Sequence, residues 1–499
     1  MTLSRRGFLA LTALLGVTRG ARADASVPSR LRGLLEVELD ALGRWAKSVG
    51  GQFGGAFIDV PSGAEVNSSF ADLPMNPASN QKLVTAGLAL RHLGPSYTFT
   101  AGVYGQLAAG RVDELVLRAS GDPSLTRGDL EAFAKALADK GVKTVVDVAV
   151  DQSAFDDHFV PPGFEQQPDE WAPFRAPVSA VALERNSVLV SVAPGERGGP
   201  AKVTFEPHGF VDVEGQIKTV ARGARPLARV GLSGNGQRLL AKVSGSVPEG
   251  SEPIRYRQRV EDPRLLAGYA LKNALSAAGI GVTGTVRSGG AAQKNELVSR
   301  KSRALADLLP ELGKQSDNFY AETLLKTVAL ETRGRPASSA AGAEIATAWL
   351  KEIGAWEAPI RVTNGSGLFD TNRLTARSLA RLLVSMHGNA QLSAAFLAQL
   401  AVGGVDGTLR SRFPKLAQRR VVLAKTGTLH DVVALSGYVM DPDRSRPIAF
   451  SLLLNGIAGR AAAGRQRIDR VVELVANELA GGTKAPVEAG EAKVRAAGG

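Results

Sequence analysis

Cysteine is absent from this 499-residue sequence, and histidine occurs only five times. Without cysteine the chain has no disulfide framework, no thiolate ligand for zinc or an iron–sulfur cluster, and no thiol nucleophile. The five histidines show no paired spacing of the kind that holds a metal ion. Any covalent catalysis must therefore use an oxygen or a lysine nucleophile.

Long hydrophobic runs are also missing, apart from a short one near the N-terminus. It follows Ser4-Arg5-Arg6-Gly7 and extends through Val17 to the small residues around Ala23, about half of the length needed to span a bilayer. A twin arginine, a short apolar region and a small-x-small site are typical of a bacterial twin-arginine signal peptide. We therefore expect residues 1–23 to direct export to the periplasm or cell envelope; a permanent membrane anchor is the alternative.

Acidic residues are fewer than basic ones, 48 against 60, which gives a formal net charge of +12. The basic residues are spread along the chain and do not form an arm, so we expect no nucleic-acid partner. Loss of the signal peptide removes four arginines and leaves a modest basic excess. Such an excess is compatible with peripheral association with an anionic envelope surface.

The pattern of apolar residues in the sequence changes after Tyr97. From there to about Val260, short alternating apolar runs are broken by Gly and Pro, which is typical of small β-rich domains. Within this region Thr126 and Asp129 predict a capping box that opens a helix. We therefore expect two small, nested β-rich domains inserted at 97–260.

The flanking parts are expected to form one domain from residues 28–96 and 261–480. A Gly- and Ala-rich tail at 481–499 has no apolar period and is expected to be disordered. Apolar periodicity and turn residues predict the following elements in the flanking parts: helices at 26–42, 79–93 and 467–479, and strands at 54–60, 420–429, 432–440 and 448–454.

A first chemical motif, Ser79-Asn80-Gln81-Lys82, lies at the start of a predicted apolar helix. Residues three apart lie on one helix face, so Lys82 can reach back towards the Ser79 hydroxyl. Serine needs a neighbouring base to become a good nucleophile, and a lysine kept neutral by burial can be that base. The alternative is a capping serine beside a solvated lysine.

Two further motifs follow in the sequence, Ser316-Asp317-Asn318 and Lys425-Thr426-Gly427-Thr428. An extended entry into a helix would point Ser316 and Asn318 to the same cleft, although simple capping of that helix would use the same residues. At the end of a strand, Lys425 offers a cation for a substrate carboxylate. Gly427 would let a substrate backbone approach, and the hydroxyls of Thr426 and Thr428 add donors.

The three motifs in this order match the serine acyl-enzyme set of penicillin-binding proteins and class A β-lactamases. With their surroundings they resemble the D-alanyl-D-alanine carboxypeptidase/endopeptidase family, the type-4 class C penicillin-binding proteins. The resemblance extends from about Pro28 to Leu479 and rests on these further segments: Gly121-Asp122-Pro123-Ser124-Leu125, Tyr320-Ala321-Glu322, Gly365-Ser366-Gly367-Leu368 with Asn372-Arg373, and Gly404-Val405-Asp406-Gly407-Thr408-Leu409.

The resemblance implies a multidomain α/β (α+β) fold with a penicillin-binding-protein/β-lactamase-like catalytic domain of antiparallel sheet and helices. It implies acyl transfer to peptidoglycan D-Ala-D-Ala peptides, with β-lactam antibiotics as covalent inhibitors and no cofactor or metal. Ser79, Lys82, Ser316, Asn318 and Lys425 would be catalytic. Which lysine is the base stays open.

Two other functions remain as alternatives to this reading. One is a serine β-lactamase or related esterase, although the long interval between Ser79 and Ser316 exceeds what that fold needs. The other is a non-catalytic peptidoglycan-binding protein. Asn364 stands where the family often has Asp, and His430 and Asp431 follow the third motif where smaller residues are usual, so these departures concern substrate preference.

Overall fold

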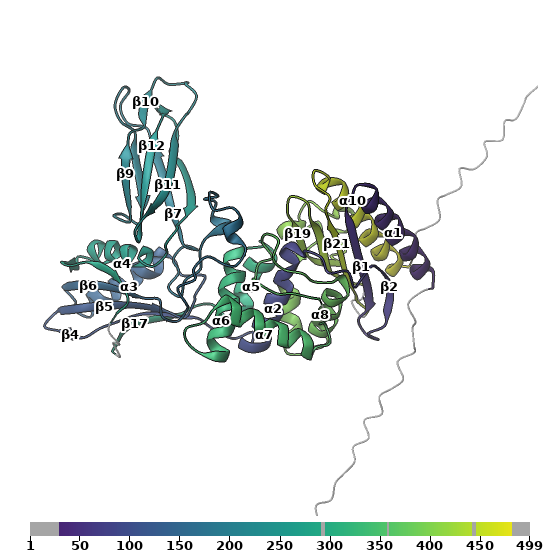
Figure 1. Cartoon of the computed structure of the whole chain (residues 1–499). Coiled ribbons are helices and arrows are strands. Elements are labelled where there is room, and N and C mark those ends of the chain that lie inside the picture. Colours follow the sequence, from purple (N-terminus) through teal and green to yellow (C-terminus); the bar gives the residue numbers. More distant parts are fainter. Residues whose placement is uncertain (1–28, 291–294, 357–358, 442–445, 482–499) are drawn as a thin grey trace, which may run out of the picture.

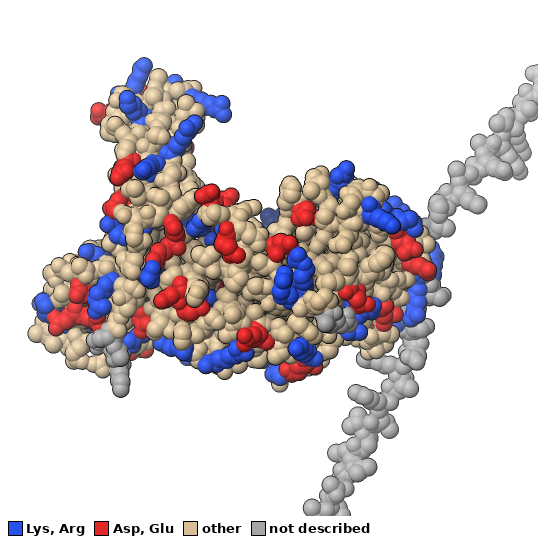
Figure 2. All heavy atoms as spheres, in the orientation of Figure 1, with Lys and Arg blue, Asp and Glu red and all other residues tan. Residues whose placement is uncertain are grey.

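The computed structural model describes residues 29–290, 295–356, 359–441 and 446–481, which form two parts side by side (Figure 1). The expected signal peptide at 1–23 and residues 482–499 of the expected tail lie outside the described residues. One part holds both described ends of the chain, and the other is an insertion with an upright β-rich column. On the face shown in Figure 2, Lys and Arg lie interspersed with Asp and Glu over both parts.

The first part is built on a six-stranded antiparallel sheet with the strand order β18-β19-β20-β21-β1-β2. This order places the N-terminal strand beside the three predicted C-terminal strands, because Gln52 pairs with Asn455 and Asp59 with Ile448. Helices α1 and α10 lie side by side on one face, and α8 packs on the opposite face (Figure 1). The bounds are β1 Gln52–Asp59, β2 Glu65–Ser69, β18 Ala401–Val402, β19 Val422–Thr428, β20 Val433–Val439, β21 Ile448–Asn455, α1 Ser29–Ser48, α8 Ala376–Gly388 and α10 Ala461–Leu479.

A group of helices packs beside this sheet around α2 (Gln81–Leu93), whose first ten residues are all buried. The sequence predicts a helix from Ser79, whereas Ala78–Asn80 forms a short 3-10 turn, η1, and α2 begins only at Gln81. Ala78 has a φ of 45°, which a regular helix excludes. The neighbouring helices are α5 Leu305–Gly313, α6 Asn318–Arg333, α7 Ser339–Glu352 and α9 Ser393–Ala398.

The insertion contains a second sheet, flanked by α3 and α4. The predicted capping box of Thr126 and Asp129 is present at the start of α3. The bounds are β3 Thr100–Tyr104, β4 Leu107–Ala108, β5 Arg111–Ala119, β6 Thr144–Asp151, β15 Gly281–Val282, β16 Val286–Ser288, β17 Glu296–Lys301, α3 Arg127–Asp139 and α4 Leu266–Ala277.

This sheet continues past residue 260, where the sequence places the end of the insertion. Strand β17 pairs with β3, strands β15 and β16 pair with β6, and α4 shares a hydrophobic core with α3. Residues 266–301 therefore belong with the insertion, which corrects their assignment to the catalytic part. The pairing of its first and last strands brings the two ends of the insertion together, as is usual for an inserted domain.

An upright column of short strands rises from this sheet (Figure 1). Its strands come from the part of the sequence between β6 and α4. It consists of two three-stranded sheets and a two-stranded one. The bounds are β7 Ser187–Ala193, β8 Lys202–Glu206, β14 Ile254–Arg259, β9 Val211–Gly215, β11 Arg229–Asn235, β12 Arg238–Ser244, β10 Lys218–Val220 and β13 Ser246–Pro248. Within the described ranges, no helix has the length and apolar character required to cross a membrane.

Candidate active site

Ser79 lies on the η1 turn and Lys82 in the first turn of α2, so the chain holds the two side chains together. Lys82 Nζ is 3.0 Å from Ser79 Oγ, 2.7 Å from Asn318 Oδ1 and 2.8 Å from the carbonyl oxygen of Ser366. The Lys82 side chain is fully buried. The alternative of a solvated lysine beside a capping serine is therefore wrong.

Burial lowers the pKa of Lys82 to about 7, against the opposing charges of Glu322 and Asp317. At neutral pH a large fraction of this lysine is thus an uncharged amine. A neutral amine has two N–H donors and one lone pair. Asn318 Oδ1 and the Ser366 carbonyl can take the two donors, which leaves the lone pair facing the Ser79 hydroxyl.

Ser316 and Lys425 form a second pair on the other side of the site. Lys425 Nζ donates to Ser316 Oγ at 2.8 Å and to the carbonyl oxygen of Thr426 at 2.8 Å. Burial, followed by the charge of Lys82, lowers the pKa of Lys425 well below its usual value. Lys425 is fully buried, so it lies inside the site and is not exposed at a sheet edge.

The entry to α6 differs from the extended conformation that the sequence predicts. Ser316 has a φ of 60° in the left-handed region, which is uncommon for a residue with a side chain. Asp317 caps α6 by accepting from Tyr320 N at 3.0 Å and pairs with Arg185 Nε at 2.9 Å. The turn sends Ser316 to Lys425 and Asn318 to Lys82, so the two side chains reach different lysines of the same site.

Strand β19 carries the third motif along the site. Strand β18 pairs with it only at Leu423 and Ala424, so among the described strands none covers that edge from Lys425 to Thr428. Thr426 Oγ1 donates to Thr408 Oγ1 at 2.8 Å. A Cβ on Gly427 would lie 3.0 Å from Pro77 O and from the Ala78 Cβ, so this glycine also lets the strand pack closely against η1.

Two residues at the site were not among the sequence candidates, Ser366 and Glu322. The Ser366 carbonyl accepts from Lys82, and the buried carboxylate of Glu322 accepts from the backbone N–H groups of Gly365 and Ser366 at 3.0 and 2.8 Å. Both residues lie in segments that carry the family resemblance. A backbone carbonyl leaves no mark in a motif, so the sequence alone gave no reason to place Ser366 beside Lys82.

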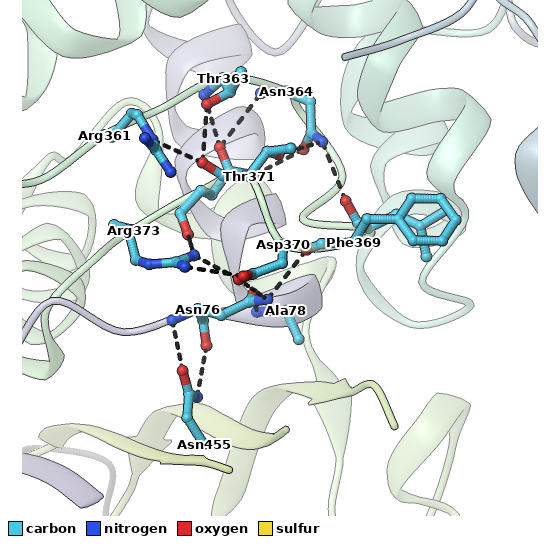
Figure 3. Close-up of polar contacts among 12 residues, drawn as sticks. Asn76, Ala78, Arg361, Thr363, Asn364, Phe369, Asp370, Thr371, Arg373 and Asn455 are labelled. Atoms are coloured by element: carbon cyan, nitrogen blue, oxygen red, sulfur yellow. Dashed lines mark hydrogen bonds and ion pairs between the residues drawn. The ribbon is translucent and has the colours of Figure 1, made fainter. Parts of the chain in front are cut away.

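The loop that carries Ser366 is held by a network of amide side chains (Figure 3). Fully buried Asn364 donates to Pro162 O at 2.8 Å, to Leu368 O at 3.2 Å and to Thr371 Oγ1 at 3.0 Å. Asn76 binds Asp370 and, through its Oδ1, the Ala78 N–H at 2.9 Å. Asn364 therefore supports the loop that carries Ser366.

Part of the insertion also reaches the site. Residues 152–178, which we call the strap, connect β6 towards the column and include short turns at Phe164–Gln166 and Pro173–Arg175. The Phe174 carbonyl of the strap accepts from Asn318 Nδ2 at 3.0 Å. The strap is tied to α6 by Lys326, whose Nζ donates to Asp156 Oδ1 at 2.6 Å and to His158 O at 2.8 Å.

The fold and the two serine–lysine pairs of the site together define the class of protein, a serine hydrolase. The described residues contain no group of three or more His, Asp or Glu side chains that could hold a metal ion.

Comparison with known proteins identifies the particular family. The model of the D-Ala-D-Ala carboxypeptidase 3 (S13) family matches residues 37–478. A D-alanyl-D-alanine carboxypeptidase from an Actinomadura species is 33% identical over 90% of this chain and 85% of its own. The D-alanyl-D-alanine carboxypeptidase DacB of Haemophilus influenzae is 27% identical over 77% of this chain and 81% of its own. The chain therefore belongs to the D-Ala-D-Ala carboxypeptidase 3 family and is a serine D-Ala-D-Ala carboxypeptidase.

The solved structures agree on the fold. The crystal structure of penicillin binding protein 4 from Haemophilus influenzae superposes with a TM-score of 0.72 and 24% identity, covering 90% of this chain and 99% of that one. A second structure of that protein, complexed with a β-lactam, gives a TM-score of 0.69 with 23% identity and the same coverage. The predicted fold class, a β-lactamase-like domain with additional small β sheets, is thus confirmed.

Proposed function

We propose that Ser79 is the nucleophile that attacks the carbonyl of the terminal D-Ala-D-Ala bond of peptidoglycan stem peptides, with Lys82 as its base. The observation that carries this proposal is the position of the buried Lys82 amine, 3.0 Å from Ser79 Oγ with its two N–H donors directed to Asn318 and Ser366. A base at hydrogen-bond distance with a pKa of about 7 is suited to proton transfer at neutral pH.

Ser316 and Lys425 supply the second proton transfer in this proposal. Their hydrogen bond of 2.8 Å supports a relay that gives a proton to the leaving amine when the peptide bond breaks. The carboxylate of the substrate lies beside Thr426 and Thr428 on the uncovered edge of β19, where the hydroxyls of the two threonines donate to it. The backbone N–H groups of Ser79 and Thr428 form the oxyanion hole, and loss of one such donor typically costs about 10²–10³ in rate.

The same acyl-enzyme extends the proposal to two further reactions. Cross-links differ from stem peptides only in the amine that leaves, so the enzyme also cleaves D-Ala cross-links as an endopeptidase. Penicillin acylates Ser79 because its strained amide takes the place of the scissile bond. The β-lactam complex of the Haemophilus protein supports this step. The N-terminal sequence supports export by the twin-arginine route and action in the cell envelope.

The test is mass analysis of the intact protein after incubation with a labelled penicillin, followed by peptide mapping. We expect one label per chain on the peptide that contains Ser79, and none in Ser79→Ala. A label on a peptide without Ser79 would overturn the assignment. Rapid turnover of penicillin without a persistent adduct would favour a β-lactamase instead, and digestion of purified cross-linked and uncross-linked muropeptides measures the endopeptidase and carboxypeptidase activities separately.

A further inference from the structure

Helix α6 presents three polar side chains in a row, half-buried Asn318 and buried Glu322 and Lys326. Residues four apart lie on one face of a helix, so this row extends from the active site to the strap. Asn318 contacts Lys82 directly, and Lys326 holds the strap. The middle residue, Glu322, is 1% exposed and has no part in the mechanism proposed above.

The carboxylate of Glu322 is connected to the base through a single residue, Ser366. Its two oxygens accept from Gly365 N at 3.0 Å and from Ser366 N at 2.8 Å, and the Ser366 carbonyl then accepts from Lys82 Nζ at 2.8 Å. Burial raises the pKa of Glu322, and the hydrogen bonds from the two N–H groups and the charge of Lys82 oppose this rise by favouring the ionised carboxylate. Glu322 thereby holds Ser366, whose carbonyl orients Lys82, and its ionised form places a negative charge near that lysine.

The charged groups around Lys82 come from two elements. Glu322 and Asp317 on α6 favour its protonated form, and Lys425 on β19 repels it. Asp317 is paired with Arg185 at 2.9 Å, which offsets its charge. On its other side Glu322 interacts electrostatically with Lys326, which forms an ion pair with Asp156 at 2.6 Å. Glu322 is therefore the buried acid whose charge acts most directly on the base.

We propose that Glu322 is a positioning residue for Lys82: it holds the Ser366 carbonyl against the amine and sets the pH range in which the amine can take the Ser79 proton. This inference rests on the proposed role of Lys82 as base. It assigns Glu322 a function in the reaction although the residue touches neither the substrate nor Ser79.

The test is the pH dependence of acylation by a reporter penicillin in Glu322→Gln. This substitution keeps the shape of the side chain and removes its charge. The acid limb is the part of the pH profile in which the acylation rate constant falls as the pH decreases. We expect this limb to move to lower pH by roughly one unit, because loss of a neighbouring negative charge lowers the pKa of Lys82 and such charges typically shift a pKa by 1–3 units. The plateau rate at high pH is expected to fall at least tenfold, because Lys82 becomes a weaker base and loses its fixed carbonyl partner.

Thr327→Val is the matched control. Thr327 is fully buried on the same helix, and its hydroxyl donates only within α6, to Thr323 O at 2.9 Å. We expect this variant to lose thermal stability without any movement of the acid limb. If acylation by Glu322→Gln declines at the same acidic pH as in the wild type, and the variant only loses stability as Thr327→Val does, Glu322 is merely structural.

Glu322→Asp provides a second readout if Glu322→Gln does not fold. It retains the charge but withdraws it by one methylene, so we expect a smaller movement of the acid limb in the same direction. An unmoved limb overturns the proposal. Failure of the proposed function is distinguishable, because in that case penicillin does not label Ser79 in the wild-type protein.

Discussion

Lys82 and Lys425 are both fully buried, yet neither forms an ion pair with a carboxylate in the described part of the chain. A buried ammonium without such a partner is costly, and the usual outcome is loss of its proton. The two lysines also repel each other when both are charged. The site therefore favours neutral amines, which is the state that a proton acceptor needs.

This environment predicts how acylation depends on pH. The pKa of Lys82 is lowered to about 7, so the neutral amine predominates above pH 7 and the ammonium below it. We expect the acylation rate constant for penicillin to rise about tenfold per pH unit below pH 7 and to level off above it. Stopped-flow measurement with a reporter β-lactam between pH 5 and 9 checks this, with melting temperatures recorded at each pH as the control. A rate that falls as pH rises through 7 would contradict a neutral lysine as the base.

Asn364 leads to a prediction on stability at the same scale. In Asn364→Asp an oxygen would replace the amide nitrogen that faces Pro162 O, Leu368 O and Thr371 Oγ1. Unsatisfied buried groups cost about 1–3 kcal/mol, and more when they are charged. We expect a clearly lower melting temperature at pH 7 that partly recovers at pH 5, where the carboxyl can be protonated. An unchanged melting temperature at pH 7 would show that the loop tolerates a carboxylate.

At the level of elements, the strap connects the insertion to the catalytic helix α6. Lys326→Met would remove the contacts to Asp156 and to the His158 carbonyl. We expect faster hydrogen exchange of the strap amides, and a fall of about tenfold or more in kcat/KM for a D-Ala-D-Ala peptide, because small displacements in a site are costly. The Phe174 carbonyl transmits the change, since it accepts from Asn318.

Arg91→Gln is the control for this variant. It removes an ion pair with Glu352 whose side chains are 49% and 58% exposed. Exposed ion pairs contribute little to the free energy of unfolding. We therefore expect hydrogen exchange in the strap and peptide hydrolysis to stay at wild-type values. Equal exchange in the strap of Lys326→Met and the wild type would show that other contacts suffice to hold it.

Local sequence signals predicted the elements well where local interactions determine them. The capping box at Thr126 and the three C-terminal strands are examples, since a cap and a period of two can be read over a few residues. The left-handed turn at Ser316 and the strap were not predicted, because contacts between distant segments hold them. The end of the insertion was misplaced for the same reason: the strand Glu296–Lys301 shows its membership only through pairing with β3.

At the level of the whole molecule, the role of the insertion can be tested by deletion. Removal of the whole expected insertion, residues 97–260, would take β3, β5 and β6 out of their sheet, so a shorter deletion is preferable. Strands β7 and β14 are antiparallel partners, with Val192 opposite Ile254. Residues 193–253 can therefore be replaced by Asn-Gly, the favoured two-residue hairpin turn. We expect this protein to keep penicillin acylation, because the acylation residues contact none of the removed segment, and to lose activity on isolated sacculi if the column positions the polymer.

The comparison for this deletion is hydrolysis of a short D-Ala-D-Ala peptide by the same preparation. A cooperative thermal transition shows that the shortened protein is folded. Equal losses on the peptide and on sacculi would rule out a positioning role for the column. Loss of acylation in a folded protein would instead show that the column supports the active site.

The pairing of β1 with β21 along its full length also governs when the enzyme can first work. Synthesis proceeds from the N-terminus, so a growing chain carries Ser79 and Lys82 long before Lys425 and the strands on either side of β19 exist. All strands of the insertion are synthesised earlier. The insertion can therefore fold before the last strands of the six-stranded sheet have been made. Strand order alone thus restricts hydrolysis to chains whose translation has passed the final strand, and prematurely terminated products remain inert.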